Sequence, residues 1–164
     1  MSTEKNLKEA FAGESQANRK YAAFAKKAEE EGYPTVAKLF RAASEAEAIH
    51  AYSELRALGA VKSTAENLKA AIEGETYEFT EMYPGFIKTA EEEGAKQAKR
   101  AFTFANEAEK VHAELYARAL EALESKTEDK VFYLCTVCGN IVEDEIPEKC
   151  SICNAPAKAF INVG

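Results

Sequence analysis

Two short segments of the chain share a pattern that can bind metal ions. One carries Glu47-x-x-His50 and the other Glu109-x-x-His112, and together they contain both histidines of the protein. On an α-helix, side chains three residues apart lie on the same face. Two such helices, each with a carboxylate-bearing partner helix, supply the ligands of a dinuclear site in a four-helix bundle. The spacing therefore predicts a dinuclear metal site between helices.

An internal repeat supplies the remaining carboxylates. Gly13-Glu14 returns as Gly74-Glu75 after 61 residues, whereas the two Glu-x-x-His segments are 62 residues apart. Each half of the helical part thus forms one hairpin that offers a Glu and then a Glu-x-x-His. The extra residue of the second half falls near Met82-Tyr83-Pro84, where a π-bulge or a kink would absorb it.

The combined ligand set has four carboxylates and two imidazoles, which suits two iron or manganese ions. We expect Glu47 and Glu109 to bridge the metals and Glu14 and Glu75 to be terminal ligands. The predicted ligands are Glu14, Glu47, His50, Glu75, Glu109 and His112.

Glu78 breaks the symmetry of the repeat. It lies one helical turn after Glu75 and so shares its face, whereas the repeat places Ala17 at the equivalent position. A seventh ligand in a six-ligand site indicates a position where ligands exchange. The alternative is an ordinary surface glutamate.

All four cysteines lie near the C-terminus, in the pairs Cys135-x-x-Cys138 and Cys150-x-x-Cys153. This spacing indicates metal ligation rather than disulfide bonding. A tail this short needs a metal to fold. Four thiolates suit either a structural zinc or a single redox-active iron, and the spacing leaves both open.

Apolar residues at helical spacing predict helices over residues 3–31, 34–58, 64–93 and 95–125. Thr3 and Thr64 are the expected N-caps, and Pro84-Gly85 is expected to interrupt the third helix. A polar linker follows at 127–130. The predicted fold is mainly α: a ferritin-like four-helix bundle (residues 1–126) followed by a small, metal-dependent, β-rich domain (residues 131–164).

Charge and hydropathy exclude some functions. A formal charge of −7 argues against nucleic-acid binding, which needs a basic face. The longest apolar runs are shorter than the ~20 residues of a membrane span. The first six residues lack the features of a secretory signal, and the cysteines are typical of a reducing compartment. We therefore expect a cytoplasmic protein without membrane or nucleic-acid partners.

The chain resembles the rubrerythrin family over nearly its whole length. The resemblance lies in Glu14 and its neighbours, both Glu-x-x-His pairs, Gly74-Glu75-x-x-Glu78 followed by Met82-Tyr83-Pro84, and the four cysteines, which look like a rubredoxin-like iron domain.

The resemblance implies a non-haem di-iron peroxidase that reduces hydrogen peroxide to water in oxidative-stress defence. It implies two irons in the bundle and one at the cysteines, with zinc as a possible substitute there. Electrons would come from a donor such as rubredoxin or its reductase, ultimately from NAD(P)H. One iron would exchange Glu78 for His50, and Tyr21 and Tyr83 would lie near the irons, although core aromatics are an alternative reading.

Two other functions compete with the peroxidase. A ferroxidase or iron-handling protein would use the same bundle but would not need the cysteine-rich tail. A helical interaction protein with a structural zinc ribbon would use neither Glu-x-x-His pair.

The connection between the hairpins is short. About six residues separate Leu58 from Thr64, a reach of roughly 20 Å, whereas a bundle of ~25-residue helices is about 35 Å long. The sequence therefore predicts a homodimer in which one chain's first hairpin packs on the partner's second hairpin. We also expect the four-cysteine iron of another chain to lie closer to a di-iron site than the chain's own.

Overall fold

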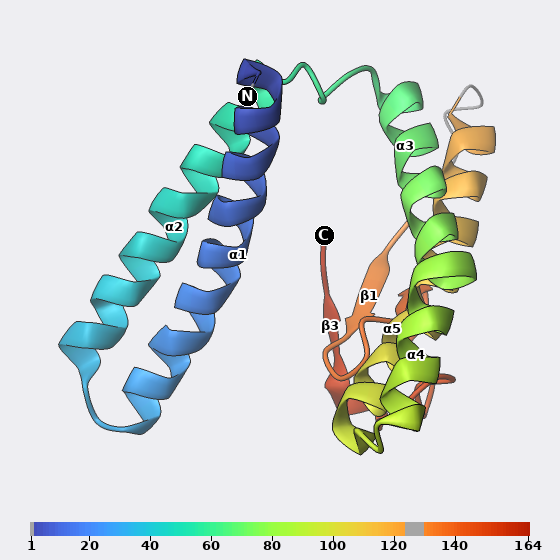
Figure 1. The fold of residues 1–164 in the computed structure, drawn as a ribbon. Helices are drawn as coiled ribbons and strands as arrows, with labels where there is room; N and C mark the ends of the chain where they lie inside the picture. Colours follow the sequence, from blue (N-terminus) through green and yellow to red (C-terminus); the bar gives the residue numbers. More distant parts are fainter. Residues whose placement is uncertain (1, 124–129) are drawn as a thin grey trace. The chain divides into compact units, whose positions relative to one another are not determined.

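The computed structural model describes residues 2–123 and 130–164. These residues form two compact units, which are divided between Lys62 and Ser63 (Figure 1). The first unit is a helical hairpin, and the second is a helical hairpin joined to a small antiparallel sheet. No helix within the described ranges is both long enough and apolar enough to span a membrane.

The first hairpin consists of α1 (Thr3–Glu30) and α2 (Pro34–Ala57). The bounds agree with the prediction within one residue, but the N-cap of α1 is Ser2, not Thr3. The Ser2 hydroxyl accepts the Lys5 backbone N–H at 3.2 Å, and a cap must stand outside the first helical residue to reach that group. Gly32 turns the chain with a φ of +80°, and a proline then begins α2.

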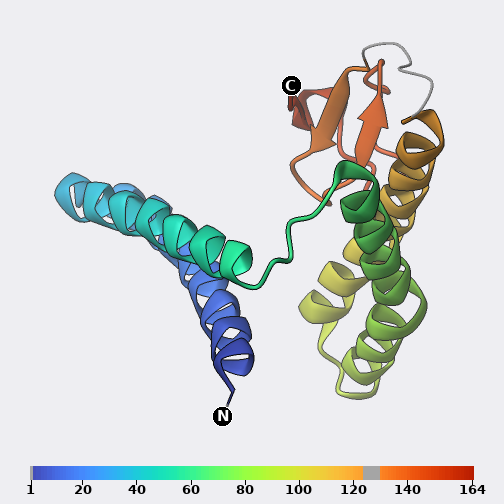
Figure 2. The same cartoon turned by 90° about the horizontal axis from the view of Figure 1, so that it is seen from above.

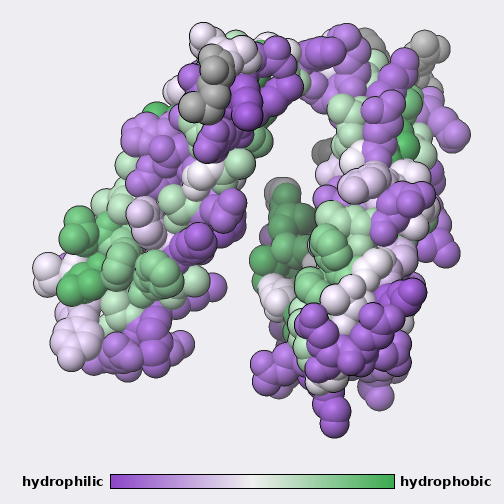
Figure 3. Space-filling model, in the orientation of Figure 1, coloured by the Kyte–Doolittle hydropathy of each residue, from purple (hydrophilic) through white to green (hydrophobic). Residues whose placement is uncertain are grey.

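Small side chains form the contact between α1 and α2. The buried residues of this hairpin are alanines and Ser44, whose hydroxyl donates to the Asn18 carbonyl at 2.8 Å. Large apolar side chains stay outside this contact: Leu39 is 68% exposed and Ile49 is 65% exposed. Figure 3 shows apolar side chains gathered on this hairpin toward its turn. The hairpin therefore has an apolar surface that its own helices do not cover.

The second hairpin begins with α3 (Thr64–Tyr77), which continues through the π-helix η1 (Glu78–Met82) into α4 (Tyr83–Glu92). Its N-cap is Ser63 rather than Thr64, because Ser63 and Glu66 form a reciprocal capping box.

The π-helix confirms that the extra residue is absorbed near Met82-Tyr83-Pro84. The Tyr83 N–H donates to the Glu78 carbonyl, five residues earlier. The irregular stretch ends just before Pro84, which stands in the first turn of α4 and has no backbone N–H to donate to the preceding turn. The predicted interruption at Pro84-Gly85 is therefore displaced toward the N-terminus.

Helix α5 (Lys96–Ala122) returns beside α3 and α4. The predicted end of this helix at Ser125 and most of the predicted linker 127–130 lie outside the described residues.

The C-terminal sheet has the strand order β2-β1-β3, with β1 (Phe132–Cys135), β2 (Ile141–Glu143) and β3 (Phe160–Asn162) all paired antiparallel. Leu134 pairs with Ile141 on one side and Ile161 on the other. A short 3₁₀ helix, η2 (Ala157–Ala159), precedes β3. The buried core here is Cys135, Cys150, Ala155 and Phe160, so metal-ligand residues occupy its centre. Figure 2 shows the sheet next to α3 and α5.

Candidate metal centres

The first hairpin brings Glu14 of α1 together with Glu47 and His50 of α2. One ligand atom from each of these residues lies within 4.8 Å of the others, and His50 Nδ1 is 2.9 Å from Glu47 Oε2. The pKa of Glu14 is raised, first by its hydrogen bond with Glu47 and then by loss of solvent. A close pair of carboxyl groups favours binding of either a proton or a cation.

The second hairpin repeats this arrangement with Glu75 of α3 and with Glu109 and His112 of α5. Their ligand atoms also lie within 4.8 Å of one another, and His112 Nδ1 is 2.7 Å from Glu109 Oε2. Burial raises the pKa of Glu75, and the negative charge of Glu109 raises it further. Each hairpin thus carries half of the predicted ligand set, as two carboxylates and one imidazole.

Glu78, the first residue of η1, lies beside the second half-site. Burial raises its pKa, the charge of Glu75 adds to the rise, and His112 opposes it. The π-helix therefore holds a further carboxylate near Glu75 and His112, outside the three-residue cluster.

Glu54 is a carboxylate near the first half-site that the sequence reading missed. Its charge contributes to the raised pKa of Glu14, and its buried Oε2 has no hydrogen-bond partner among the described residues. The position of Glu54, one helical turn after His50, places it on the same helix face and could have indicated this role from the sequence.

The predicted tyrosines lie in matching aromatic clusters. Tyr83 packs against Phe86 and Phe102, with ring centroids 6.2 Å away in both cases. The first hairpin has a corresponding cluster of Tyr21, Phe24 and Phe40. Each of these residues lies 62 positions before its counterpart. Burial raises the pKa of Tyr83, and the negative charges of Glu78, Glu109 and Glu75 raise it further. Tyr83 thus lies beside the carboxylates, while the contacts of Tyr21 are with its aromatic neighbours.

His112 links the second half-site to the cysteine domain of the same chain. Its Nε2 is 2.9 Å from the carbonyl oxygen of Gly139, the residue after Cys138. A carbonyl can only accept, so Nε2–H donates and Nδ1 is left for a metal ion. This contact contradicts our expectation that another chain's cysteine domain would lie closer, because the chain folds its own domain back onto α5.

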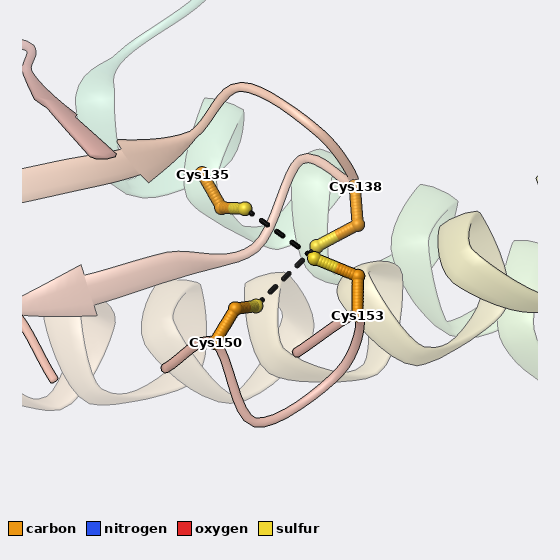
Figure 4. Close-up of side chains that lie close together, drawn as sticks. All are labelled: Cys135, Cys138, Cys150 and Cys153. Atoms are coloured by element: carbon orange, nitrogen blue, oxygen red, sulfur yellow. Dashed lines mark hydrogen bonds between the residues drawn. The ribbon is translucent and has the colours of Figure 1, made fainter. Parts of the chain in front are cut away.

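The four cysteine sulfurs converge between two loops (Figure 4). The Sγ atoms of Cys135 and Cys153 are 3.7 Å apart, and those of Cys138 and Cys150 are 3.6 Å apart. A tetrahedral ion with metal–sulfur bonds of about 2.3 Å has sulfur–sulfur edges of about 3.8 Å, so the arrangement fits one metal ion. Burial alone would raise the pKa of Cys150, but backbone N–H groups of Cys153 and Ile152 donate to its sulfur and lower that pKa to about 7.

Sequence models of known families match both parts of the chain. The model described as "Rubrerythrin" matches residues 5–120, and that described as "Rubrerythrin, rubredoxin-like domain" matches residues 133–161.

Individual relatives match almost the whole chain. Nigerythrin of Nitratidesulfovibrio vulgaris is 42% identical over 97% of this chain and 85% of its own length. Rubrerythrin of Porphyromonas gingivalis is 36% identical over 96% of this chain and 88% of its own length. A structure of nigerythrin in a mixed-valence state has a TM-score of 0.60 at 42% identity, covering 99% of this chain and 87% of that one.

These similarities confirm the fold class, a ferritin-like helical domain followed by a rubredoxin-like domain. They also confirm the expected cofactors, which are iron at the carboxylates and histidines of the bundle and iron at the four cysteines. The matches span both domains and the donor atoms converge in both, and on these grounds the chain belongs to the rubrerythrin family.

Proposed function

We propose that this protein is a peroxidase that reduces hydrogen peroxide to water, with electrons relayed through its four-cysteine iron. The observation that carries the proposal is the double contact of His112. Its Nδ1 belongs to the cluster around Glu109, and its Nε2 meets the Gly139 carbonyl next to Cys138. One imidazole and one hydrogen bond thus connect the redox site in the helices with the redox site in the tail.

The bound irons supply redox capacity: reducing one hydrogen peroxide to two waters takes two electrons and two protons. In this arrangement Glu14, Glu47 and His50 would hold metal from one hairpin, and Glu75, Glu109 and His112 from the other. Glu78 adds a carboxylate beside the second half-site. Its exchange with His50 as a ligand of one iron is part of this proposal.

Tyr83 and Glu78 are suited to handling the protons. Burial and the nearby carboxylates raise the pKa of the Tyr83 phenol further above physiological pH. The phenol would therefore stay protonated and could donate a hydrogen bond to hydrogen peroxide. The raised pKa of Glu78 lets its carboxyl take up a proton more readily than an exposed glutamate does. Tyr21 is the equivalent candidate in the first hairpin.

The electron donor would be a protein such as rubredoxin or its reductase, linked to NAD(P)H. Arg118 of α5 and Glu143 of β2 form an ion pair at 2.5 Å, which helps to keep the cysteine domain against His112. Electrons would then pass within one chain. We place this reaction in the cytoplasm, where a reducing environment favours thiolate ligands over disulfides.

We further propose that the complete di-iron site forms in a homodimer with exchanged hairpins. Residues 58–63 are the whole connection between α2 and α3, too short to follow the length of a bundle. The exposed Leu39 and Ile49 of the first hairpin need a covering layer, which the partner's second hairpin would provide.

The reaction is tested by peroxide consumption with a reduced rubredoxin-type donor and iron-loaded protein. We expect donor oxidation to track peroxide at a ratio of two electrons per peroxide. A Cys150→Ser variant should lose donor-driven turnover, while its chemically reduced helical site should still consume peroxide once. Protein that ignored peroxide but oxidised ferrous iron with dioxygen would contradict the proposal and favour a ferroxidase.

A further inference from the structure

Asn140 is a buried polar residue inside the four-cysteine domain. Its side chain is only 2% exposed, and it follows Cys138 and Gly139 at the start of the chain's return toward β2. Amide groups are rarely buried without a hydrogen-bonding role, because their desolvation is unfavourable. The surroundings of Asn140 therefore need an explanation.

The contacts of Asn140 reach both cysteine pairs. Its backbone carbonyl accepts the Cys135 N–H at 2.8 Å, and its backbone N–H donates to the Cys138 sulfur. Its side-chain Nδ2 lies 3.7 Å from the Cys150 Sγ. The other side-chain atom, Oδ1, has no hydrogen-bond partner in the described part of the chain. The side-chain amide is thus directed at a metal-ligand sulfur.

A hydrogen bond to a ligand sulfur affects the two oxidation states unequally. When the four thiolates hold iron, one-electron reduction adds one negative charge to the site. An N–H donor stabilises the more negative, reduced form more strongly, and burial strengthens the effect. Such a donor therefore raises the reduction potential.

Backbone donors are also present, because the N–H groups of Cys153 and Ile152 point at the Cys150 sulfur. Those donors follow from the fold of the loop and are available to any sequence that adopts it. The Asn140 side chain is different, since another residue at this position would remove it without changing the loop.

We propose that Asn140 raises the reduction potential of the four-cysteine iron by donating its side-chain N–H to the Cys150 sulfur. The proposal rests on iron at this site and not on the peroxidase reaction. A higher potential makes this iron easier to reduce by an external donor and keeps it reduced between turnovers.

The test is a spectroelectrochemical titration of the visible absorption of the full-length, iron-loaded protein. Asn140→Leu keeps the approximate size of the side chain and removes its donor. We expect the potential to fall, with a decrease of about tenfold in the equilibrium constant for reduction, or about 59 mV for a one-electron couple. Asn162→Leu is the matched control: Asn162 is an exposed residue of β3, and its substitution should leave the potential unchanged.

A second variant and a second measurement cover the case in which Asn140→Leu does not hold iron. Asn140→Asp keeps the shape and replaces the donor with an acceptor, so its potential should also fall. In wild-type protein loaded with cadmium-113, the Asn140 side-chain amide protons should couple to the metal through the hydrogen bond. Unchanged potentials in the variants, or no such coupling, would overturn the proposal whatever the peroxide activity.

Discussion

At the scale of single residues, some of the proposed ligand carboxylates oppose folding while no metal is bound. Glu75 illustrates this, because burial and the nearby Glu109 charge favour its protonated form. Its pKa in the folded, metal-free protein is therefore higher than in the unfolded chain. Such a group binds more protons when folded, so its contribution makes the metal-free protein less stable as the pH rises through the folded pKa. Metal binding removes this cost by supplying the missing positive charge.

We predict that Glu75→Gln stabilises the metal-free protein at neutral and mildly alkaline pH. The neutral amide removes the charge that the folded state disfavours, so the midpoint of thermal unfolding should rise by a few degrees. The gain should shrink on acidification and vanish below the unfolded pKa, near 4.3, where the wild-type carboxyl is protonated in both states. Far-UV circular dichroism across this pH range measures the effect.

Glu73→Gln is the control for Glu75→Gln. Glu73 stands two residues earlier on the same helix and is exposed, so its substitution should leave the pH profile unchanged. In iron-loaded protein, Glu75→Gln should instead have a lower midpoint of thermal unfolding than the wild type, because the substitution removes a proposed ligand. A metal-free Glu75→Gln protein with wild-type stability at every pH would contradict the role assigned to burial.

At the scale of elements, most features that the sequence predicts follow from the internal repeat and from helical spacing. The offset changing from 61 to 62 placed the π-helix near Met82, and helical spacing gave the hairpin bounds almost to the residue. The same offset relates the tyrosine–phenylalanine clusters, which could have been predicted from it. The N-caps were each wrong by one residue, because adjacent serine and threonine can both cap and only backbone geometry decides between them.

The contact between His112 and Gly139 could not be read from the sequence. It depends on how the C-terminal domain docks on α5, and neither residue type carries a signal for that docking. Asn140 was likewise unpredictable as a sulfur donor, because its burial follows from the pairing of β1 with β2.

We predict that the ion pair between Arg118 and Glu143 supports electron transfer by holding these elements together. Arg118→Glu should slow oxidation of the reduced four-cysteine iron by peroxide. The loss should be up to about fivefold, since an exposed pair contributes about 1 kcal/mol or less. Stopped-flow absorption of the iron–thiolate band in a single turnover measures this rate.

The reversed pair provides the internal check for Arg118→Glu. Adding Glu143→Arg to that variant restores opposite charges and should recover much of the rate. Lys110→Glu makes the same charge change at an exposed site on the same helix and should have little effect. Equal slowing by Lys110→Glu would show that overall charge, rather than docking, sets the rate.

At the scale of the whole molecule, the ligand set is divided between units joined by a short connection. Each hairpin contributes two carboxylates and an imidazole, and each lacks the other half. The first hairpin buries alanines and serine and leaves its large apolar side chains exposed, so it needs a second layer to fold stably. The proposed hairpin exchange between two chains would satisfy both requirements without lengthening residues 58–63.

Exchange predicts that defective chains complement one another. Glu47→Ala damages the first hairpin and Glu109→Ala, its counterpart in the repeat, damages the second. An exchanged heterodimer contains two bundles, each built from one chain's first hairpin and the other chain's second hairpin. One bundle therefore contains both substituted hairpins, and the other contains both intact hairpins. Random mixing makes half of the dimers heterodimers, so about a quarter of wild-type di-iron sites and peroxide activity should return.

The control mixes Glu14→Ala chains with Glu47→Ala chains, which are both damaged in the first hairpin. Every bundle then contains a defective first hairpin, so no activity should return in any arrangement. The two chains are mixed by refolding them together, and native mass spectrometry establishes that heterodimers form. If heterodimers of Glu47→Ala and Glu109→Ala chains formed without regaining iron, each bundle would have to be built from a single chain, and residues 58–63 would have to span it.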